Sequence, residues 1–185
     1  MTTPRVSIQT HDFDVSAELA TLRAQDKRVG AVCCFVGTVR DRNRAPAPGT
    51  AACSLPPEGA LAPSGGQAEP EDDTVASMEL EHYPGMTEKS IEAMIDAAFT
   101  RFDIFGARVI HRVGLLRPLD QIVLVAVTSA HRGASFQACE FLMDYLKTQA
   151  PFWKKEATAQ GARWVDARVS DDAALARWGI TSSNA

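Results

Sequence analysis

The side chains of this chain that could do chemistry are mostly cations at the ends of expected strands and helices. They are Arg40, His131, Arg132, Lys147, Lys154 and Lys155. His131 and Arg132 directly precede an expected helix, where the helix dipole disfavours added positive charge by about 0.3–1 kcal/mol. Because backbone N–H groups at such an end bind anions, the pair indicates a site for a small anion. A loop histidine that only hydrogen-bonds locally is the other explanation of position 131.

The lysines are ambiguous when each is taken alone. Lys147 falls in the last turn of the expected helix, where the dipole favours a cation, so a solvated surface lysine is the simpler explanation of that position. In the strand that follows, period-two alternation places Lys154 and Glu156 on one face with Phe152, and Lys155 on the other. Only one of these two neighbouring lysines can therefore face a given pocket.

The cysteines and histidines do not form a metal-binding pattern. The four cysteines are Cys33, Cys34, Cys53 and Cys139, and none has a partner at zinc-ligand spacing. The adjacent pair lies on an apolar strand and Cys139 within a helix, so we expect these three thiols to be core residues rather than sulfur relays. His82 and His111 lie within expected strands, where a structural role is the simpler explanation. We expect no metal.

Composition limits the class of protein. The chain has 185 residues, of which 45% are hydrophobic and 23% charged, which suits one ordinary domain with a single core. Its net charge of −4 argues against broad nucleic-acid binding, which needs a basic face. We find no apolar run of about eighteen residues and no signal-peptide pattern, so we expect a cytoplasmic protein without membrane contact.

Hydrophobic periodicity predicts the strands that must position the cations. They cover residues 29–39, 76–83, 107–113 and 121–129, followed by a two-stranded hairpin over 152–169 with a break at Gly161. The first strand is an almost unbroken apolar run, as expected of a strand that is covered on both faces.

Two helices are expected between and after these strands. The first is capped by Thr87 and has Glu88 in its first turn. Its apolar stripe consists of Ile91, Met94, Ile95, Ala98, Phe99 and Phe102. The second helix covers about 133–149 and is stopped by Pro151.

Residues 41–75 interrupt this regular pattern. They contain six of the ten prolines and four of the twelve glycines, which predicts a flexible loop insertion at the surface. Strands outnumber helices elsewhere, without strict βαβ alternation. This favours one α+β domain over 1–185, with a mixed or antiparallel sheet and packed helices.

Four segments together resemble the large-subunit family of molybdopterin synthase. They are FVGTVRDRN (35–43), LEHYPGMTEKSIEAM (80–94), HRVGLLRPLDQIVLVAVTSAHRGASFQACEFLMDYLKTQAPFWKKEAT (111–158) and RWVDAR (163–168). The resemblance covers nearly the whole chain outside 41–75. It implies an α/β-hammerhead fold and a homodimer of large subunits within a heterotetramer. A small ubiquitin-like sulfur-carrier subunit is then expected at each end.

The same resemblance implies a sulfurtransferase. Sulfur would pass from the carrier's C-terminal Gly-Gly thiocarboxylate to cyclic pyranopterin monophosphate, forming the dithiolene of molybdopterin, with no cofactor. Because this chain ends in GITSSNA, we expect it to be the receiving partner rather than the carrier. The family's substrate-contacting positions fall on Thr38, Val39, Arg40, His131, Arg132, Lys147, Lys154, Lys155 and Glu156. Arg40, His131 and Arg132 would then hold the phosphate, and Lys147 and Lys154 would be catalytic.

Two other functions fit parts of the sequence. A catalytically silent subunit would bind the pterin and the carrier without doing chemistry, although the presence of both Lys147 and Lys154 argues against it. An RNA-binding module would need aromatic stacking positions on a basic face, and the acidic composition gives it little support.

Overall fold

Two four-stranded sheets and three helices make up the described parts of the chain. The computed structural model describes residues 4–41, 75–158, 161–165 and 177–179. In chain order the elements are β1 (Val6–Gln9), α1 (Val15–Arg23), β2 (Ala31–Thr38), β3 (Val75–His82), α2 (Met86–Arg101), β4 (Gly106–Arg112), β5 (Gly114–Leu116), β6 (Gln121–Ser129), α3 (Arg132–Gln149), β7 (Phe152–Thr158) and β8 (Gly161–Val165). The predicted α+β class is confirmed.

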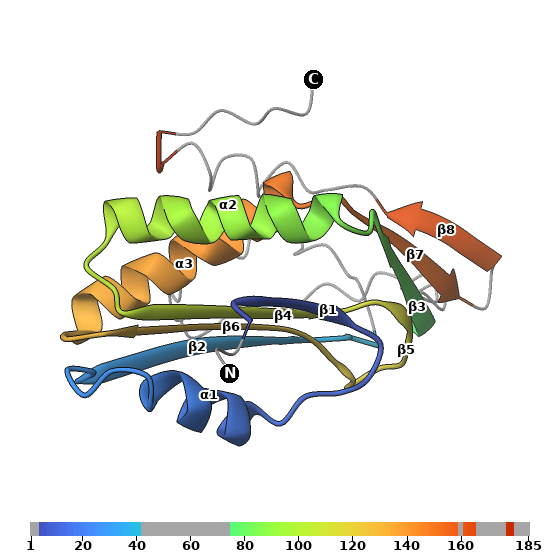
Figure 1. Cartoon of the computed structure of the whole chain (residues 1–185). Coiled ribbons are helices and arrows are strands. Elements are labelled where there is room, and N and C mark those ends of the chain that lie inside the picture. The colour runs from blue at the N-terminus through green and yellow to red at the C-terminus, as the bar shows by residue number, and fades with distance from the viewer. Residues whose placement is uncertain (1–3, 42–74, 159–160, 166–176, 180–185) are drawn as a thin grey trace, which may run out of the picture.

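The first sheet has the strand order β1-β4-β6-β2 and is covered on both faces. β1 pairs with β4 in parallel, and the β4–β6 and β6–β2 pairs are antiparallel. α2 and α3 lie over one face and α1 lies over the other (Figure 1). The larger apolar core lies under α2 and α3, where Ile91, Ile95 and Phe141 are fully buried.

The second sheet has the order β5-β3-β7-β8 and is antiparallel throughout. It stands beside the ends of β4 and β6, away from α1 (Figure 1). The chain passes from the first sheet to the second at Val113 and Gly114, where β4 leads into β5. Gly114 has a φ of 84°, a conformation that glycine adopts without steric cost. The predicted hairpin is confirmed as β7 and β8, and its residues 166–169 lie outside the described residues.

The prediction that the first strand is covered on both faces is wrong. Within the described residues β2 pairs with β6 alone and forms the edge of its sheet. Val32 is 40% exposed and Phe35 42%, and Cys34 is exposed as well. The apolar run therefore does not reflect burial within this chain, and it leaves an apolar strand edge open.

Thr87 is not the cap of α2, as was expected. The cap is Gly85, whose N–H donates to Glu88 Oε2 at 2.7 Å. Thr87 lies one residue inside the helix and is fully buried. Its hydroxyl accepts from the Tyr83 N–H and donates to the Pro151 carbonyl. The four predicted stripe residues from 91 to 98 are buried, whereas Phe99 is 38% exposed.

Two features near the N-terminus were not expected from the sequence. They are the short strand β1 and the short helix α1. α1 is capped by Asp14, whose carboxylate accepts from the Ala17 N–H at 3.0 Å. The predicted loop at 41–75 lies outside the described residues except at its ends, where the Val75 N–H donates to the Asp41 carbonyl at 2.7 Å. Among the helices of the described part, none is long and apolar enough to cross a membrane.

Candidate active site

A pocket of about 160 Å³ opens where the end of β2 meets the inner face of the second sheet. It is lined by Thr38, Val39, Arg40, Val75, Met78, Ile122 and Lys154. Four of these residues are predicted site positions: the three consecutive residues 38–40 and Lys154. The structure thus brings together side chains that are more than a hundred residues apart in sequence.

A β-bulge shapes the end of β2 that carries Arg40. Gly37 pairs with Val123 but Thr38 pairs with Gln121, so Ile122 has no ladder partner on β2. Bulges re-aim side chains beside functional sites, and here Ile122 lines the pocket. Beyond the bulge, the Val39 N–H donates to the Asp120 carbonyl at 2.9 Å. The bulge and this hydrogen bond fix the backbone position of the residue before Arg40.

Apolar side chains form the floor of the pocket. Val39, Val75 and Met78 are each no more than 3% exposed. Val39 and Met78 belong to a small core cluster with Leu80 and Leu116. Charge interactions are stronger beside such a low-dielectric wall than in open water. The attraction between a bound anion and the side chains of Arg40 and Lys154 would therefore be stronger here than at an open surface.

Lys154 faces the pocket because of its register in β7. It stands opposite Leu80 of β3, whose side chain is buried on the inner face of the sheet. Lys155 pairs with Glu79, which is exposed on the other face. The prediction that only one of the two lysines faces the pocket is confirmed. Glu156 stands opposite Met78 in the same ladder.

Lys147 is not one of the pocket's described lining residues. It is exposed in the last turn of α3, between the buried residues Leu146 and Thr148. The chain turns at 150–151 and enters β7 at Phe152. Lys147 and Lys154 therefore flank one short connection between a helix and a strand.

His131 and Arg132 lie far from this pocket within one chain. His131 is the residue before α3, and its carbonyl accepts from Ser129 Oγ at 2.8 Å. The same Ser129 accepts through its carbonyl from Gly30 N–H, at the start of β2. An eight-residue strand spans roughly 25 Å, so this end of β2 is about that far from Arg40. The expected phosphate-binding trio does not meet within a single chain.

Three pocket residues were missed by sequence reasoning. Val75 and Met78 are inward-facing residues of β3, and strand alternation could have identified Met78 as inward but not as pocket-lining. Ile122 reaches the pocket because of the bulge. Its position in an apolar run carried no signal that distinguished it from its buried neighbours.

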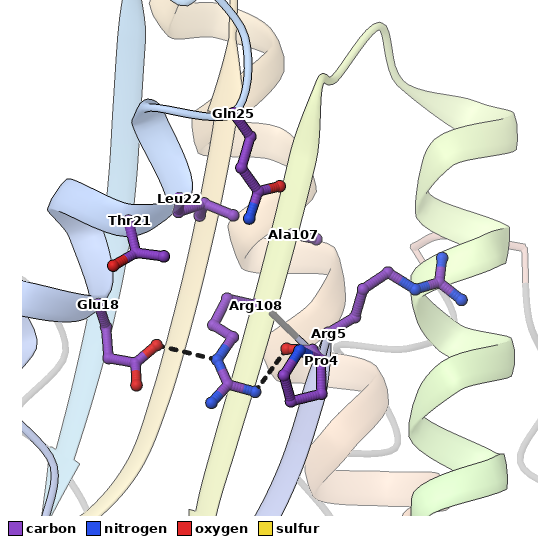
Figure 2. A pocket seen from close by; sticks show the side chains of 8 residues that line it. All are labelled: Pro4, Arg5, Glu18, Thr21, Leu22, Gln25, Ala107 and Arg108. Atoms are coloured by element: carbon purple, nitrogen blue, oxygen red, sulfur yellow. Dashed lines mark hydrogen bonds and ion pairs between the residues drawn. The ribbon is translucent and has the colours of Figure 1, made fainter. Parts of the chain in front are cut away.

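A second hollow lies between α1 and β4, and it is structural (Figure 2). Its volume is only about 20 Å³, which is close to the space of one water molecule. The buried Arg108 guanidinium crosses it, donating to Glu18 Oε2 at 3.0 Å and to the Pro4 carbonyl at 2.7 Å. These bonds tie the N-terminal segment and α1 to the sheet.

The thiols take different positions. Cys139 is 4% exposed in the main core, and burial raises the pKa of its thiol strongly. Cys33 faces the same core and its thiol pKa is also raised by burial. The expectation of core packing is confirmed for these two. It is wrong for Cys34, which is exposed because β2 is an edge strand. Cys53 lies outside the described residues.

One protein family matches most of this sequence. A family model described as MoaE protein matches residues 8–149. The chain belongs to this family. The MoaE match includes both ends of β2 and the whole of α3.

Individual relatives in the MoaE family extend the match to nearly the full chain. A protein of Ralstonia nicotianae named molybdopterin synthase catalytic subunit is 55% identical over 182 residues, which are 98% of this chain and 88% of the relative. The solved MoaE structure from Burkholderia ambifaria superposes with a TM-score of 0.71 at 50% identity, covering 96% of this chain and 99% of that one.

A more distant structure shares the fold. It is a protein–protein complex of subunits 1 and 2 of molybdopterin-converting factor from Helicobacter pylori. The superposed chain has a TM-score of 0.62 at 16% identity, with 89% of this chain and 92% of that chain covered.

Proposed function

We propose that this protein is a molybdopterin synthase catalytic subunit, a sulfurtransferase of molybdenum cofactor biosynthesis. Its sulfur donor is the C-terminal thiocarboxylate of a small ubiquitin-like carrier, and its acceptor is cyclic pyranopterin monophosphate. In net terms the carrier's R–COS⁻ exchanges sulfur for an oxygen on a pterin side-chain carbon and is left as R–COO⁻. Two such exchanges complete the dithiolene. The expected compartment is the cytoplasm, where thiols stay reduced.

The observation that carries the proposal is the convergence of Arg40 and Lys154 on one pocket with an apolar floor. Arginine offers a planar fork of donors that suits phosphate oxygens. Lys154 is a compact ammonium that can neutralise a thiocarboxylate and the negative charge that grows on oxygen or sulfur during transfer. The pocket thus offers one cation for the phosphate of the pterin and one for the thiocarboxylate of the carrier.

Lys147 is the proposed proton-transfer group at the carbon that loses sulfur. It lies in the last turn of α3, and the two-residue connection 150–151 leads from this helix into the strand that carries Lys154. An extended carrier tail that ends beside Lys154 can approach from this connection. Lys155 and Glu156 are the remaining proposed substrate positions on β7, and of the two neighbouring lysines only Lys154 faces the pocket.

A second copy of the chain would complete the phosphate site. The open edge of β2 carries the exposed apolar residues Val32 and Phe35, and such an edge is a template for pairing with another strand. Antiparallel pairing of two β2 edges about a two-fold axis sets the start of one strand beside the end of the other. His131 and Arg132 of one copy would then lie near Arg40 of the other.

Reconstitution with thiocarboxylated carrier and the phosphorylated pterin tests the function. Wild type should form dithiolene product, and Lys154→Ala and Lys147→Ala should each lower the rate by about 100-fold or more. Lys89→Ala is the matched control, because Lys89 is an exposed lysine of α2 that does not line the pocket. Binding of carrier and pterin without product in the wild type would identify the silent binding subunit instead.

Mixed dimers test the shared phosphate site. Arg40→Ala and Arg132→Ala should each be inactive alone. When equal amounts are mixed and refolded together, half of the dimers are mixed and each holds one intact site, so about a quarter of the wild-type activity should return. If both cations act in the same chain, mixing restores nothing.

A further inference from the structure

Two adjacent polar residues at the end of β4 are buried and lie outside the pocket. His111 is 8% exposed and Arg112 is 9% exposed, in a strand whose residues are all buried. Neighbouring residues of a strand face opposite sides of the sheet. Buried polar groups cost free energy unless they are hydrogen-bonded, so the contacts of this pair indicate what they hold in place.

His111 supports the start of β7. Its ring stacks on the Phe152 ring with a centroid distance of 3.8 Å and an interplanar angle of 17°. Its Nδ1 lies 2.8 Å from the Arg112 carbonyl, so Nδ1 must carry the donated proton. Phe152 is two residues before Lys154 and therefore on the same face of the strand. The stack between the His111 and Phe152 rings therefore fixes the distance between the end of β4 and the start of β7.

A second contact secures the same connection. Thr87 Oγ1 of α2 donates to the Pro151 carbonyl at 3.3 Å, and the Phe152 N–H donates to the Ala150 carbonyl at 2.8 Å. Two residues between Lys147 and Lys154 are thus fixed by contacts. Pro151 is bonded to Thr87 of α2, and Phe152 is stacked on His111 of β4. Both proposed catalytic lysines depend on where this connection lies.

Arg112 supports the other half of the site. Its guanidinium donates to the Gln121 carbonyl at 3.0 Å and contacts Asp12 Oδ1 at 3.4 Å. Gln121 Nε2 donates to the same Asp12 oxygen at 2.9 Å. Gln121 is the ladder partner of Thr38 at the bulge. Arg112 therefore braces the strand position that carries the chain into Arg40.

We propose that His111 and Arg112 are positioning residues, which set the lysine-bearing connection and the Thr38–Arg40 strand end relative to each other. Their shared backbone couples the two halves, because His111 and Arg112 are consecutive and one bonds to the other's carbonyl. The assignment of a catalytic purpose to this geometry rests on the proposed function, but the geometry can be tested without it.

The first test measures the environment of Lys154 directly. Amine labelling of the folded chain across a pH series, followed by mass spectrometry, reports the reactivity of each lysine. His111→Ala should change the Lys154 labelling rate, relative to Lys89, by about threefold or more. His111→Phe keeps a flat ring under Phe152 and should restore the wild-type ratio. His11→Ala is the control, because His11 is exposed.

The labelling results have definite meanings. Labelling is carried out under conditions in which urea unfolding shows each variant to be fully folded, so a changed ratio reports a local change at Lys154. An unchanged ratio overturns the proposal. If His111→Ala does not fold, Phe152→Leu removes the stack from the other side and should change the ratio in the same way. An unaltered ratio in that variant also overturns the proposal.

The second test uses sulfur transfer. His111→Ala should lower kcat by about tenfold or more and leave KM for the pterin within about twofold, because it moves the lysine side of the site. Arg112→Gln should mainly raise that KM, because it loosens the arginine side, and exposed Arg23→Gln is its control. Equal changes of both constants in both variants would refute separate positioning roles. A wild type without transfer would refute the proposed function and leave the labelling result standing.

Discussion

Acidification should destabilise this protein through His111. Burial lowers the pKa of its imidazole from the ordinary value of 6.5 to about 4, and the nearby His82 adds repulsion in the same direction. In the unfolded chain the same imidazole takes up a proton near its ordinary pKa. Between these two pKa values the unfolded state therefore binds more protons than the native state. The free energy of unfolding must fall as the pH falls through this window.

The size of the effect follows from the two pKa values. One pKa unit is worth about 1.4 kcal/mol, so the full difference is worth about 3.5 kcal/mol and is lost once the pH is below the folded pKa. At pH 5 about 2 kcal/mol should already be lost relative to pH 7.5. That is a large part of the typical free energy of unfolding of a domain, which is about 5–15 kcal/mol.

Urea unfolding at pH 7.5 and pH 5 measures this loss. The comparison of wild type with His111→Phe isolates the imidazole, because every other ionisable side chain is the same in both proteins. Wild type should lose about 2 kcal/mol more than the variant between the two pH values. His11→Phe, at an exposed histidine, should behave as wild type. Parallel pH profiles for wild type and His111→Phe would refute the reasoning.

Four further substitutions test the packing and the backbone. Trp178→Ala removes edge-to-face contacts with two core phenylalanines and a 2.8 Å bond to Asp144, so thermal unfolding should show a loss of about 2 kcal/mol; an unchanged Tm contradicts this. Gly30→Ala would place Cβ 2.5 Å from the Ala130 carbonyl oxygen and should destabilise by more than about 1 kcal/mol. A Cβ at Gly133 would have no atom within 4 Å, so Gly133→Ala should stabilise α3 by up to about 1 kcal/mol. Equal urea midpoints for the two variants would contradict both expectations. Leu119 has a φ of 77° and is 87% exposed, so Leu119→Gly should stabilise by roughly 1 kcal/mol in the same urea assay, and a loss would show that its backbone is not strained.

Local pattern was a reliable guide where one element decides the outcome. The alternation in β7 separated Lys154 from Lys155, and the register with β3 confirms that division. The periodicity of α2 identified its buried face, although the cap was misplaced because Thr87 bonds to Pro151, which is distant in sequence. Short β1 and weakly patterned α1 gave no comparable signal, since their burial depends on the strands beside them.

The amino-acid sequence alone determined the α+β class, most elements, the family resemblance and the residues able to grip a small anion. Only the tertiary structure decided that β2 is an edge strand, that Ile122 turns into the pocket at a bulge, and that His131 lies at the far end of β2 from Arg40. The reason is that hydrophobic periodicity indicates which side chains of an element are buried, but not which other element buries them. Strand order, register and the separation of two strand ends arise from contacts between distant segments, and no local window contains them.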